Sequence, residues 1–303
     1  MIATTEWELL HESVGLVERS ARGKLLLGGG GAAEFLQGQV TNDVESLAAG
    51  AGCYAALLSH KGKMRADLRV LCGADWIWLD TEAEGLAPLR RTVETYSLGR
   101  DVQMTDVTAS RAILSLLGPA AGRALDAEPS TEEHSFVEGE HGLYARTDHG
   151  IDVICESADV DAVRDALGVE AVSEEAAECL RIESGRPRFG VDVGIETIPQ
   201  EAGLNDRAVS FTKGCYVGQE TVARLHYRGK PNRHLRGLRL SEPATTGEPV
   251  AAGDRAVGVL GSTTVSPVHG PIALAVLRRE AGPGDSVAVG HDAAPAEVTD
   301  LPF

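Results

Sequence analysis

Long hydrophobic runs and paired cysteines are missing from this chain of 303 residues. No apolar stretch approaches the roughly 20 residues that a membrane-spanning helix needs, which excludes a helical membrane protein. The first ten residues contain Glu6 and Glu8 and no basic cluster, so they do not resemble a secretory signal. We therefore expect a cytoplasmic location and no membrane partner.

The cysteines are too few and too widely spaced to form a metal site or a disulfide framework. The five of them form no CxxC or CxH pair, which excludes a zinc site or a complete iron–sulfur cage within the sequence: Cys53, Cys72, Cys155, Cys179 and Cys215. Reduced thiols are the simple interpretation in a cytosolic protein. We expect four of the five to lie in the core and no metal to be resident.

Positive charge is also scarce. Lys and Arg number 28 against 45 Asp and Glu, which gives a net charge of −17, and lysine supplies only five of the cations. Such a chain repels nucleic acid and anionic membranes at long range, which argues against general nucleic-acid binding but not against a local basic site. The acidity and the Arg bias fit a halophilic source, and a GC-rich genome would give the same Arg bias.

The remaining composition is that of an ordinary soluble protein, and its length predicts about two domains. Strand-like runs at 24–27, 54–58 and 64–71 mix with helix-like runs at 88–96 and 174–183. No strict alternation of strand and helix joins them, which favours an α+β fold over a doubly wound sheet.

A change in composition marks a second domain. From about residue 233 onward, short β-like runs are separated by Gly, Pro and Asp turns, which is typical of a small antiparallel barrel or sandwich. We place the domains at 1–232 and 233–303.

One short segment stands out as a candidate reactive site. Two glycines flank Cys215, so the backbone can turn tightly and expose the thiol. Lys213 lies two residues away, and Gln219 and Glu220 are expected to begin a helix. A nearby ammonium and a helix N-terminus both favour a thiolate. The alternative is a turn with a buried cysteine.

Neighbouring residues suggest a ligand. Tyr216 can offer a flat face to an aromatic molecule. Residues 213–239 contain seven basic residues and one acid, a local charge of +6, and they include Arg224 and Arg228. Internal salt bridges would account for this cluster, and so would a polyanionic ligand such as a polyglutamate tail or RNA. Upstream, Glu201 lies in a turn rich in Pro and Gly, where its carboxylate can accept two N–H donors from a heterocycle.

Together these motifs resemble a known family. The run Lys213–Glu220, KGCYVGQE, is similar to the signature of the YgfZ proteins, which are folate-binding relatives of the glycine-cleavage T protein, an aminomethyltransferase. The runs 35–44, 61–68 and 180–185, and the residues around Glu201, resemble further motifs that both branches share. The resemblance extends from about residue 22 to 303.

The resemblance implies a fold and a cofactor. It implies α+β folate-binding subdomains around a central channel, with a break near residues 100–110, followed by the small C-terminal antiparallel β-barrel. Tetrahydrofolate or a one-carbon derivative would occupy the channel, with Glu201 on the pterin ring. The basic segment would then hold the glutamate tail of the folate.

One departure bears on the choice of branch. The aminomethyltransferases carry an Asp-Asp pair where this chain has Ala66 and Asp67, and because Asp67 remains, their activity is not excluded. They lack the Lys-Gly-Cys-Tyr signature, however, and usually run longer than 303 residues. Both of these differences favour the YgfZ branch, whose members support iron–sulfur clusters in client enzymes, including one that modifies tRNA. Three hypotheses follow: folate-dependent cluster maintenance centred on Cys215, an aminomethyltransferase that needs Asp67, and a non-catalytic tRNA-binding module using residues 213–239.

Overall fold

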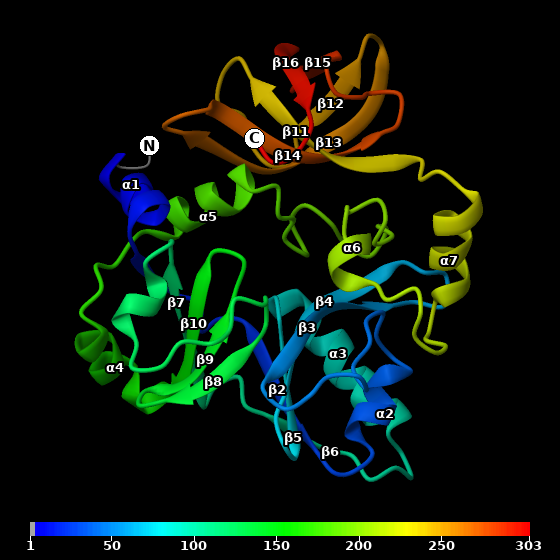
Figure 1. The fold of residues 1–303 in the computed structure, drawn as a ribbon. Helices are drawn as coiled ribbons and strands as arrows, with labels where there is room; N and C mark the ends of the chain where they lie inside the picture. The colour runs from blue at the N-terminus through cyan, green and yellow to red at the C-terminus, as the bar shows by residue number, and fades with distance from the viewer. Residues whose placement is uncertain (1–3) are drawn as a thin grey trace.

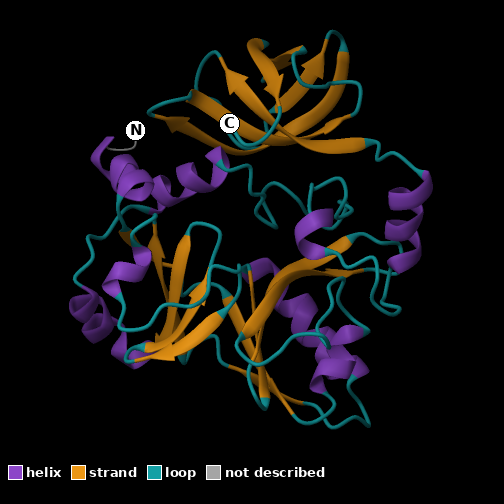
Figure 2. Ribbon diagram, in the orientation of Figure 1, coloured by secondary structure: helices purple, strands orange, loops and turns teal. Residues whose placement is uncertain are grey.

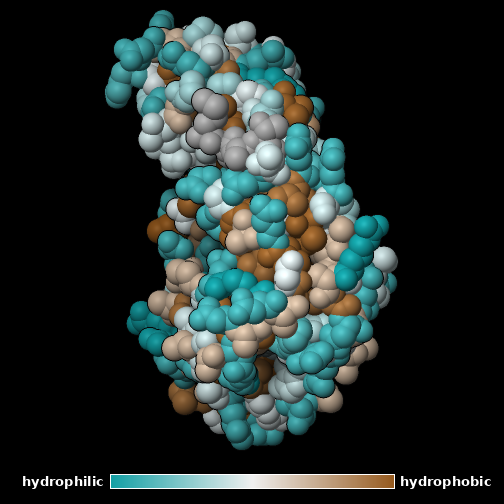
Figure 3. Space-filling model, turned by 90° about the vertical axis from the view of Figure 1, so that its left-hand side faces the viewer, coloured by the Kyte–Doolittle hydropathy of each residue, from teal (hydrophilic) through white to brown (hydrophobic). Residues whose placement is uncertain are grey.

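The computed structural model describes residues 4–303 as two five-stranded sheets and a closed barrel (Figures 1 and 2). The two sheets form the lower body in Figure 1, and the barrel lies above them. Seen from the side of α1 (Thr4–Glu12), the barrel is a distinct lobe joined to the body by a narrower waist (Figure 3). This arrangement confirms the predicted α+β fold with a small C-terminal barrel.

The first sheet contains, in spatial order, β3 (Ala51–Leu58), β4 (Met64–Cys72), β5 (Trp76–Thr81), β2 (Gly23–Gly28) and β6 (Gln103–Asp106). Side chains alternate between its faces, as a period of two requires. Along β4, Ala66 and Leu68 enter an apolar core with Phe35 from α2 (Ala32–Gln37) and Leu89 from α3 (Ala83–Tyr96). The residue between them, Asp67, therefore points to the opposite face.

The second sheet contains, in spatial order, β1 (Gly15–Glu18), β7 (Arg111–Leu117), β10 (Gly150–Glu156), β9 (Gly142–Arg146) and β8 (Phe136–Gly139). One face packs against α4 (Val160–Leu167) through residues such as Leu114 and Val153. On the other face, Ile113 and Ile154 meet Leu71 and Trp78 of the first sheet. The two sheets thus share an apolar contact, and short 3₁₀ turns lie at Ala121–Ala124 and Ser157–Asp159.

The barrel closes in the order β11 (Arg233–Leu240), β14 (Gly270–Arg278), β13 (Arg255–Ser266), β12 (Pro249–Ala252), β15 (Ser286–Val289) and β16 (Ala294–Thr299). It rests on α5 (Glu174–Glu183), where Ile182 packs with Leu235, Ile272 and Phe303. The short α6 (Asn205–Ala208) and the longer α7 (Gln219–Arg228) lie between body and barrel on the other side (Figure 1). No helix within residues 4–303 has the length and apolar character that crossing a membrane would take.

Candidate functional site

A charged cavity lies where the two sheets face each other beneath α5. It encloses about 170 Å³. Tyr54, Asp67, Arg69 and Asp80 line it from the first sheet, and Asp152 lines it from the second. These residues share the face of each sheet that also makes the apolar contact, so the space between the sheets is apolar at one end and ionic at the other.

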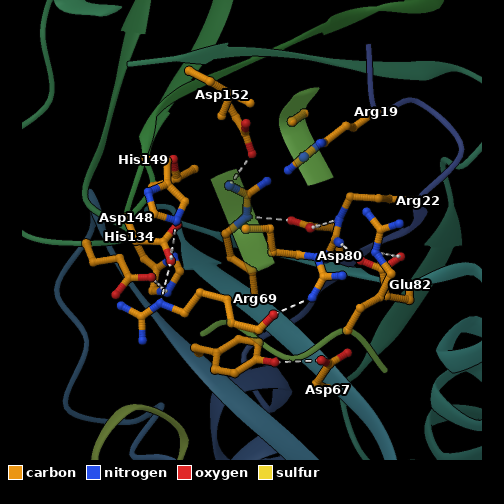
Figure 4. Close-up of a pocket in the computed structure, with 18 of the residues that line it drawn as sticks. Arg19, Arg22, Asp67, Arg69, Asp80, Glu82, His134, Asp148, His149 and Asp152 are labelled. Carbon is orange, nitrogen blue, oxygen red and sulfur yellow. Dashed lines mark hydrogen bonds and ion pairs between the residues drawn. The ribbon is translucent and has the colours of Figure 1, made fainter. Parts of the chain in front are cut away.

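Arg69 is the centre of an ion-pair network in this cavity (Figure 4). Its Nε donates to Asp80 Oδ2 at 2.7 Å and its Nη1 to Asp152 Oδ2 at 2.7 Å. Arg22 Nε donates to the other oxygen of Asp80 at 2.8 Å. Burial alone would raise the pKa of Asp80, but the guanidinium groups of Arg69 and Arg22 hold it well below its usual range. The network keeps these side chains charged and fixes the geometry of the wall.

Among the described residues, Asp67 is the one carboxyl group lining the cavity that has no arginine within ion-pair distance. It is 5% exposed, and it accepts a 2.6 Å hydrogen bond from the hydroxyl of Tyr54. Burial raises its pKa to about 6, the nearby Glu82 adds to the rise, and the Tyr54 hydroxyl opposes it. A carboxyl group that titrates near neutral pH can both accept and donate a proton under physiological conditions.

The cavity is rich in polar atoms without partners. Within residues 4–303, eleven buried side-chain nitrogen or oxygen atoms have no hydrogen-bond partner, and eight of them belong to residues that line this cavity. They come from seven side chains, with both ring nitrogens of His134 among them: Arg19, Arg69, His134, Thr147, His149, Arg186 and Arg207. Three of the atoms, on His134, His149 and Arg186, lie within 4.0 Å of a carboxylate oxygen. Buried polar groups in native proteins nearly always have a partner, so this concentration indicates a binding site for a polar ligand.

Cys215 lies elsewhere, in the turn that precedes α7. It is the one exposed cysteine among the five; Cys155 and Cys179 are buried, and Cys53 and Cys72 are half-buried. On either side, Lys213 and Tyr216 are buried and anchor the segment. The chain therefore presents the thiol outward between two fixed neighbours.

Lys213 does not serve the role expected for it. Its Nζ donates to three backbone carbonyl oxygens, those of Gln37 at 2.6 Å, Val40 at 2.7 Å and Asn42 at 2.8 Å. All three N–H donors of the ammonium are thus used, and none is left for the thiol of Cys215. Burial lowers the pKa of Lys213 to about 8. The prediction that this lysine stabilises a thiolate is corrected: it joins the segment before α7 to the loop after α2.

The turn between β3 and β4, which begins the run 61–68, packs against the same segment before α7. Gly218 begins α7 with a φ of 84°, and a Cβ there would lie 2.5 Å from the carbonyl oxygen of Ser59 in the β3–β4 turn. Gly62 of that turn has a φ of 77°, and a Cβ there would lie 2.7 Å from the Cβ of Thr221. Three sequence motifs that are far apart in the chain therefore pack together around the segment that carries Cys215.

The other predicted ligand residues around Cys215 have different surroundings. Tyr216 is buried in an apolar cluster with Lys213 Nζ 5.2 Å from its ring centroid, so it offers no open face to an aromatic ligand. Glu220, Arg224 and Arg228 are exposed on α7, and Gln219 is half-buried at its start. None of these residues lines the cavity that contains Asp67.

Glu201 also lies outside the lining of that cavity. Its carboxylate is 7% exposed and binds Arg233 at both oxygens, with Nε to Oε1 at 3.1 Å and Nη2 to Oε2 at 2.9 Å. The two N–H donors that we expected from a heterocycle are thus supplied by Arg233, the first residue of β11. Arg236 pairs with Asp300, so part of the basic segment is neutralised internally.

Sequence reasoning found one cavity residue, Asp67, and missed the rest. Arg69 lies two positions further along β4 and must therefore share its face, a signal that the period of two makes available. His134 and Thr147 come from loops next to the second sheet, and no local pattern identifies them. Asp67 lines this cavity and Cys215 and Lys213 do not, so the residues of the two hypotheses lie in different places.

Comparison with known proteins identifies the relatives of this chain. A family model described as the GCVT N-terminal domain matches residues 1–150, and one described as the glycine cleavage T-protein C-terminal barrel domain matches residues 233–303. The chain is 29% identical to an aminomethyltransferase of Rubrobacter xylanophilus, over 98% of this chain and 85% of the relative. It is 27% identical to a tRNA-modifying protein YgfZ of Colwellia psychrerythraea, over 73% of this chain and 70% of the relative.

A solved structure has the same fold. The glycine cleavage system aminomethyltransferase T from Bartonella henselae matches with a TM-score of 0.89 and 23% sequence identity, over 99% of this chain and 88% of that one.

Proposed function

Since the chain belongs to the superfamily of the glycine cleavage T protein, we propose that it binds a reduced folate in the cavity between the two sheets and presents Cys215 to iron–sulfur client proteins. The folate part of the proposal is supported by the concentration of unpartnered buried polar atoms around the cavity. The thiol part is supported by the exposure of Cys215 between two anchored residues.

The chemistry of the cavity suits a pterin. A pterin ring carries both N–H donors and acceptor atoms, and the cavity offers carboxylates at Asp67 and Glu82 together with unpartnered donors at Arg19 and Arg69. Tetrahydrofolate, when bound, supplies a carrier for one-carbon units. The role we propose for Asp67 is to hold or release a proton beside the ligand, since its pKa of about 6 lies close to the working pH.

The proposed role of Cys215 is to contact a cluster that belongs to another protein. A single thiolate can ligate iron, but one cysteine cannot hold a cluster. Within residues 4–303, no group of three His, Cys, Asp or Glu side chains is arranged to bind a metal ion. The cluster is therefore the substrate in this proposal, and its other ligands come from the client.

Genetic complementation tests the proposal. A strain lacking the endogenous gene receives plasmids for wild type, Cys215→Ser, Asp67→Asn or Cys72→Ser, and the activity of a cluster-dependent tRNA-modifying enzyme is read from its nucleoside product. We expect Cys215→Ser to fail and Cys72→Ser, the matched control at a half-buried cysteine, to rescue. Full rescue by Cys215→Ser would contradict the thiol-centred role.

A folate-dependent aminomethyltransferase is the second candidate, and the position of Ala66 favours keeping it. Ala66 is fully buried on the α3 side of the first sheet, where its Cβ lies 3.0 Å from the position that a Cβ on Gly85 would take. The acid missing from the Asp-Asp pair would thus face the core and not the cavity, so its absence takes no carboxylate from the ligand site. In this alternative Asp67→Asn abolishes activity while Cys215→Ser preserves it.

The surface of α7 supports a third role, contact with tRNA. Arg224, Arg228 and Lys230 are exposed and have no carboxylate within ion-pair distance among residues 4–303. Tyr227 beside them is 66% exposed, and aromatic side chains among cations can stack on bases. We propose this surface as an accessory contact within the cluster-maintenance role.

A further inference from the structure

Arg207 lies over the ring of Tyr54, the tyrosine that bonds to Asp67. The guanidinium carbon Cζ is 5.3 Å from the centroid of the ring, within the roughly 6 Å over which an aromatic face attracts a cation. The hydroxyl of the same ring donates at 2.6 Å to Oδ2 of Asp67 (Figure 4). Arg207, Tyr54 and Asp67 therefore form a chain of two contacts that ends at the carboxyl group.

The backbone on both sides of the first contact is fixed by neighbouring polar side chains. Asn42 Nδ2 donates to the carbonyl oxygen of Tyr54 at 2.8 Å and to that of Arg207 at 3.2 Å. The hydroxyl of Thr41 donates to the carbonyl oxygen of Ala208 at 2.5 Å. These bonds hold α6, which carries Arg207, against β3, which carries Tyr54.

The guanidinium group of Arg207 is held from the side of the second sheet. Its Nη2 pairs with Glu133, which precedes β8, and lies 3.4 Å from Oδ2 of Asp148, in the turn between β9 and β10. Because the backbone and the guanidinium group are both anchored, the side chain is fixed across the ring of Tyr54. A fixed arginine loses little further rotamer entropy by keeping this contact.

A cation in this position strengthens the hydrogen bond that Tyr54 donates. Burial raises the pKa of the Tyr54 hydroxyl well above its usual range, the Asp67 carboxylate adds to the rise, and Arg207 opposes it. A positive charge beside the ring makes the hydroxyl proton more acidic, so the hydroxyl becomes a stronger donor to a carboxylate. The stronger bond in turn favours the ionised form of Asp67.

Other charged or titratable groups of the cavity lining surround this chain of contacts. They come from the loop before β2, from β4, from β5 and the residue after it, and from the loop before β8: Arg22, Arg69, Asp80, Glu82 and His134. Besides burial, Glu82 raises the pKa of Asp67 and Arg22 lowers it. The ring centroid of His134 lies 6.4 Å from that of Tyr54, and burial lowers the pKa of His134 to about 4, so this ring is uncharged near neutral pH.

We propose that Arg207 is a positioning residue for Asp67, which it serves by covering the ring of Tyr54 and keeping the hydroxyl on the carboxylate. This inference deepens the proposed function and rests on it for the role of Asp67 in proton transfer. Its consequence is that Asp67 is held more fully as a carboxylate near neutral pH, ready to accept a proton from the ligand, than its buried position alone allows.

The test follows the carboxyl carbon of Asp67 by NMR as a function of pH, in the full-length protein without ligand. Arg207→Met removes the charge and keeps an unbranched side chain, whereas Arg207→Lys keeps a cation. The matched control is Arg186→Met, because Arg186 lines the same cavity and pairs with Asp148 at 2.9 Å. Each neutral variant leaves Asp148 with one arginine, so neither strands a buried carboxylate. The melting temperature of every variant is recorded.

We expect Arg207→Met to raise the midpoint of the Asp67 titration by about 0.5 to 1 pH unit, a three- to tenfold increase in proton affinity, because a partly buried cation–π contact contributes on that order. Arg207→Lys should restore about half of the shift or more, and Arg186→Met should leave the midpoint in place. The double variant Tyr54→Phe/Arg207→Met should have the midpoint of Tyr54→Phe alone, since Arg207 acts through the hydroxyl.

Three results would overturn the positioning role. The first is an unchanged midpoint in folded Arg207→Met. The second is a pair of shifts that add in the double variant, which would mean that Arg207 acts on Asp67 directly. The third is that neither Arg207→Met nor a second neutral variant, Arg207→Gln, folds, which would make the arginine structural.

Folate binding is measured separately, so that the two proposals can fail independently. The dissociation constant of 5-formyltetrahydrofolate is determined from pH 5 to 8 for wild type and Arg207→Met. We expect the affinity of wild type to change around pH 6 and the change in Arg207→Met to move to higher pH together with the Asp67 midpoint. If wild type does not bind the folate, the proposed function fails, and the titration without ligand still decides the role of Arg207.

Discussion

The hydroxyl of Tyr54 donates a 2.6 Å hydrogen bond to Oδ2 of Asp67 across two neighbouring strands of the first sheet. The bond stabilises the carboxylate form of Asp67 against the burial that disfavours it. Asp67 is thereby held as a group that titrates near neutral pH at the floor of the cavity. The relationship gives the site a measurable pH dependence.

The first prediction concerns this titration. Because burial raises the pKa of Asp67 to about 6 in the folded protein, against an ordinary value of about 4, the native state binds this proton more tightly than the unfolded chain does. The protonated carboxyl group of Asp67 therefore stabilises the fold below pH 4, and this stabilisation is lost as the pH rises through 6. The free energy of unfolding of Asp67→Asn should therefore rise by about 2–3 kcal/mol relative to that of wild type between pH 4 and 7, as measured by urea unfolding at each pH.

Tyr54→Phe provides the opposite control. Without the hydroxyl, the carboxylate loses its hydrogen bond, so the pKa of Asp67 should rise further above 6. The pH dependence of the carboxyl signal, followed by NMR, measures this shift. A midpoint that stays in place or moves to lower pH contradicts the assignment of the hydrogen bond.

The second prediction concerns the lysine of the signature motif. Lys213→Met removes the ammonium that bonds to the carbonyl oxygens of Gln37, Val40 and Asn42 and leaves these acceptors without their donor. We expect a loss of about 2–4 kcal/mol in the free energy of unfolding. Lys230→Met, at an exposed lysine, should change it by less than about 0.5 kcal/mol.

The same variant separates structure from thiol chemistry. Because Lys213 has no donor left for Cys215, the pH profile of alkylation of Cys215 by iodoacetamide should be the same in Lys213→Met as in wild type, under conditions where both are folded. A profile displaced to higher pH in the variant would restore the role first predicted for this lysine.

The third prediction concerns the contact between body and barrel. Asp192 is buried, and it accepts hydrogen bonds from Arg181 Nη1 at 3.0 Å and from the backbone N–H and hydroxyl of Ser262 in β13 at 2.7 and 2.9 Å. Asp192→Asn removes one of the two carboxylates paired with Arg181, the other being that of Glu178, and should cost about 3 kcal/mol of stability. Glu242→Gln, an exposed acid of the barrel domain, is the control and should have no measurable effect on chemical unfolding.

The fourth prediction tests the surface of α7 for RNA contact. Neutralising Arg224, Arg228 and Lys230 together to Gln should abolish any salt-sensitive binding of tRNA in a filter-binding assay, because these cations have no internal partner. A control variant with Arg91, Arg278 and Arg279 changed to Gln alters the net charge equally at exposed positions elsewhere. Equal loss in both variants would indicate a non-specific charge effect, and binding that survives in the first variant would remove α7 as the contact.

Local patterns in the sequence were sufficient to predict the class of fold and the exposed thiol of Cys215. The short β-like runs and turns after residue 233 predicted the barrel, because the alternation of a strand and the residues of a turn both involve positions adjacent in the sequence. The glycines near Cys215 predicted its exposure for the same reason. Asp67 could be selected because it belongs to a motif that resembles a known family.

Tertiary structure alone decided what surrounds these residues. Lys213 donates to backbone carbonyl oxygens about 175 residues earlier in the chain. Because every residue has a backbone carbonyl group, no sequence pattern could identify these three acceptors. Likewise, Arg69 and Asp152 meet because two sheets pack face to face, which brings together charges that are 83 positions apart. The sequence by itself determined which side chains each strand presents on each face. Which of those faces meet, and so which donors are left free for a ligand, depends on long-range packing that no local pattern specifies.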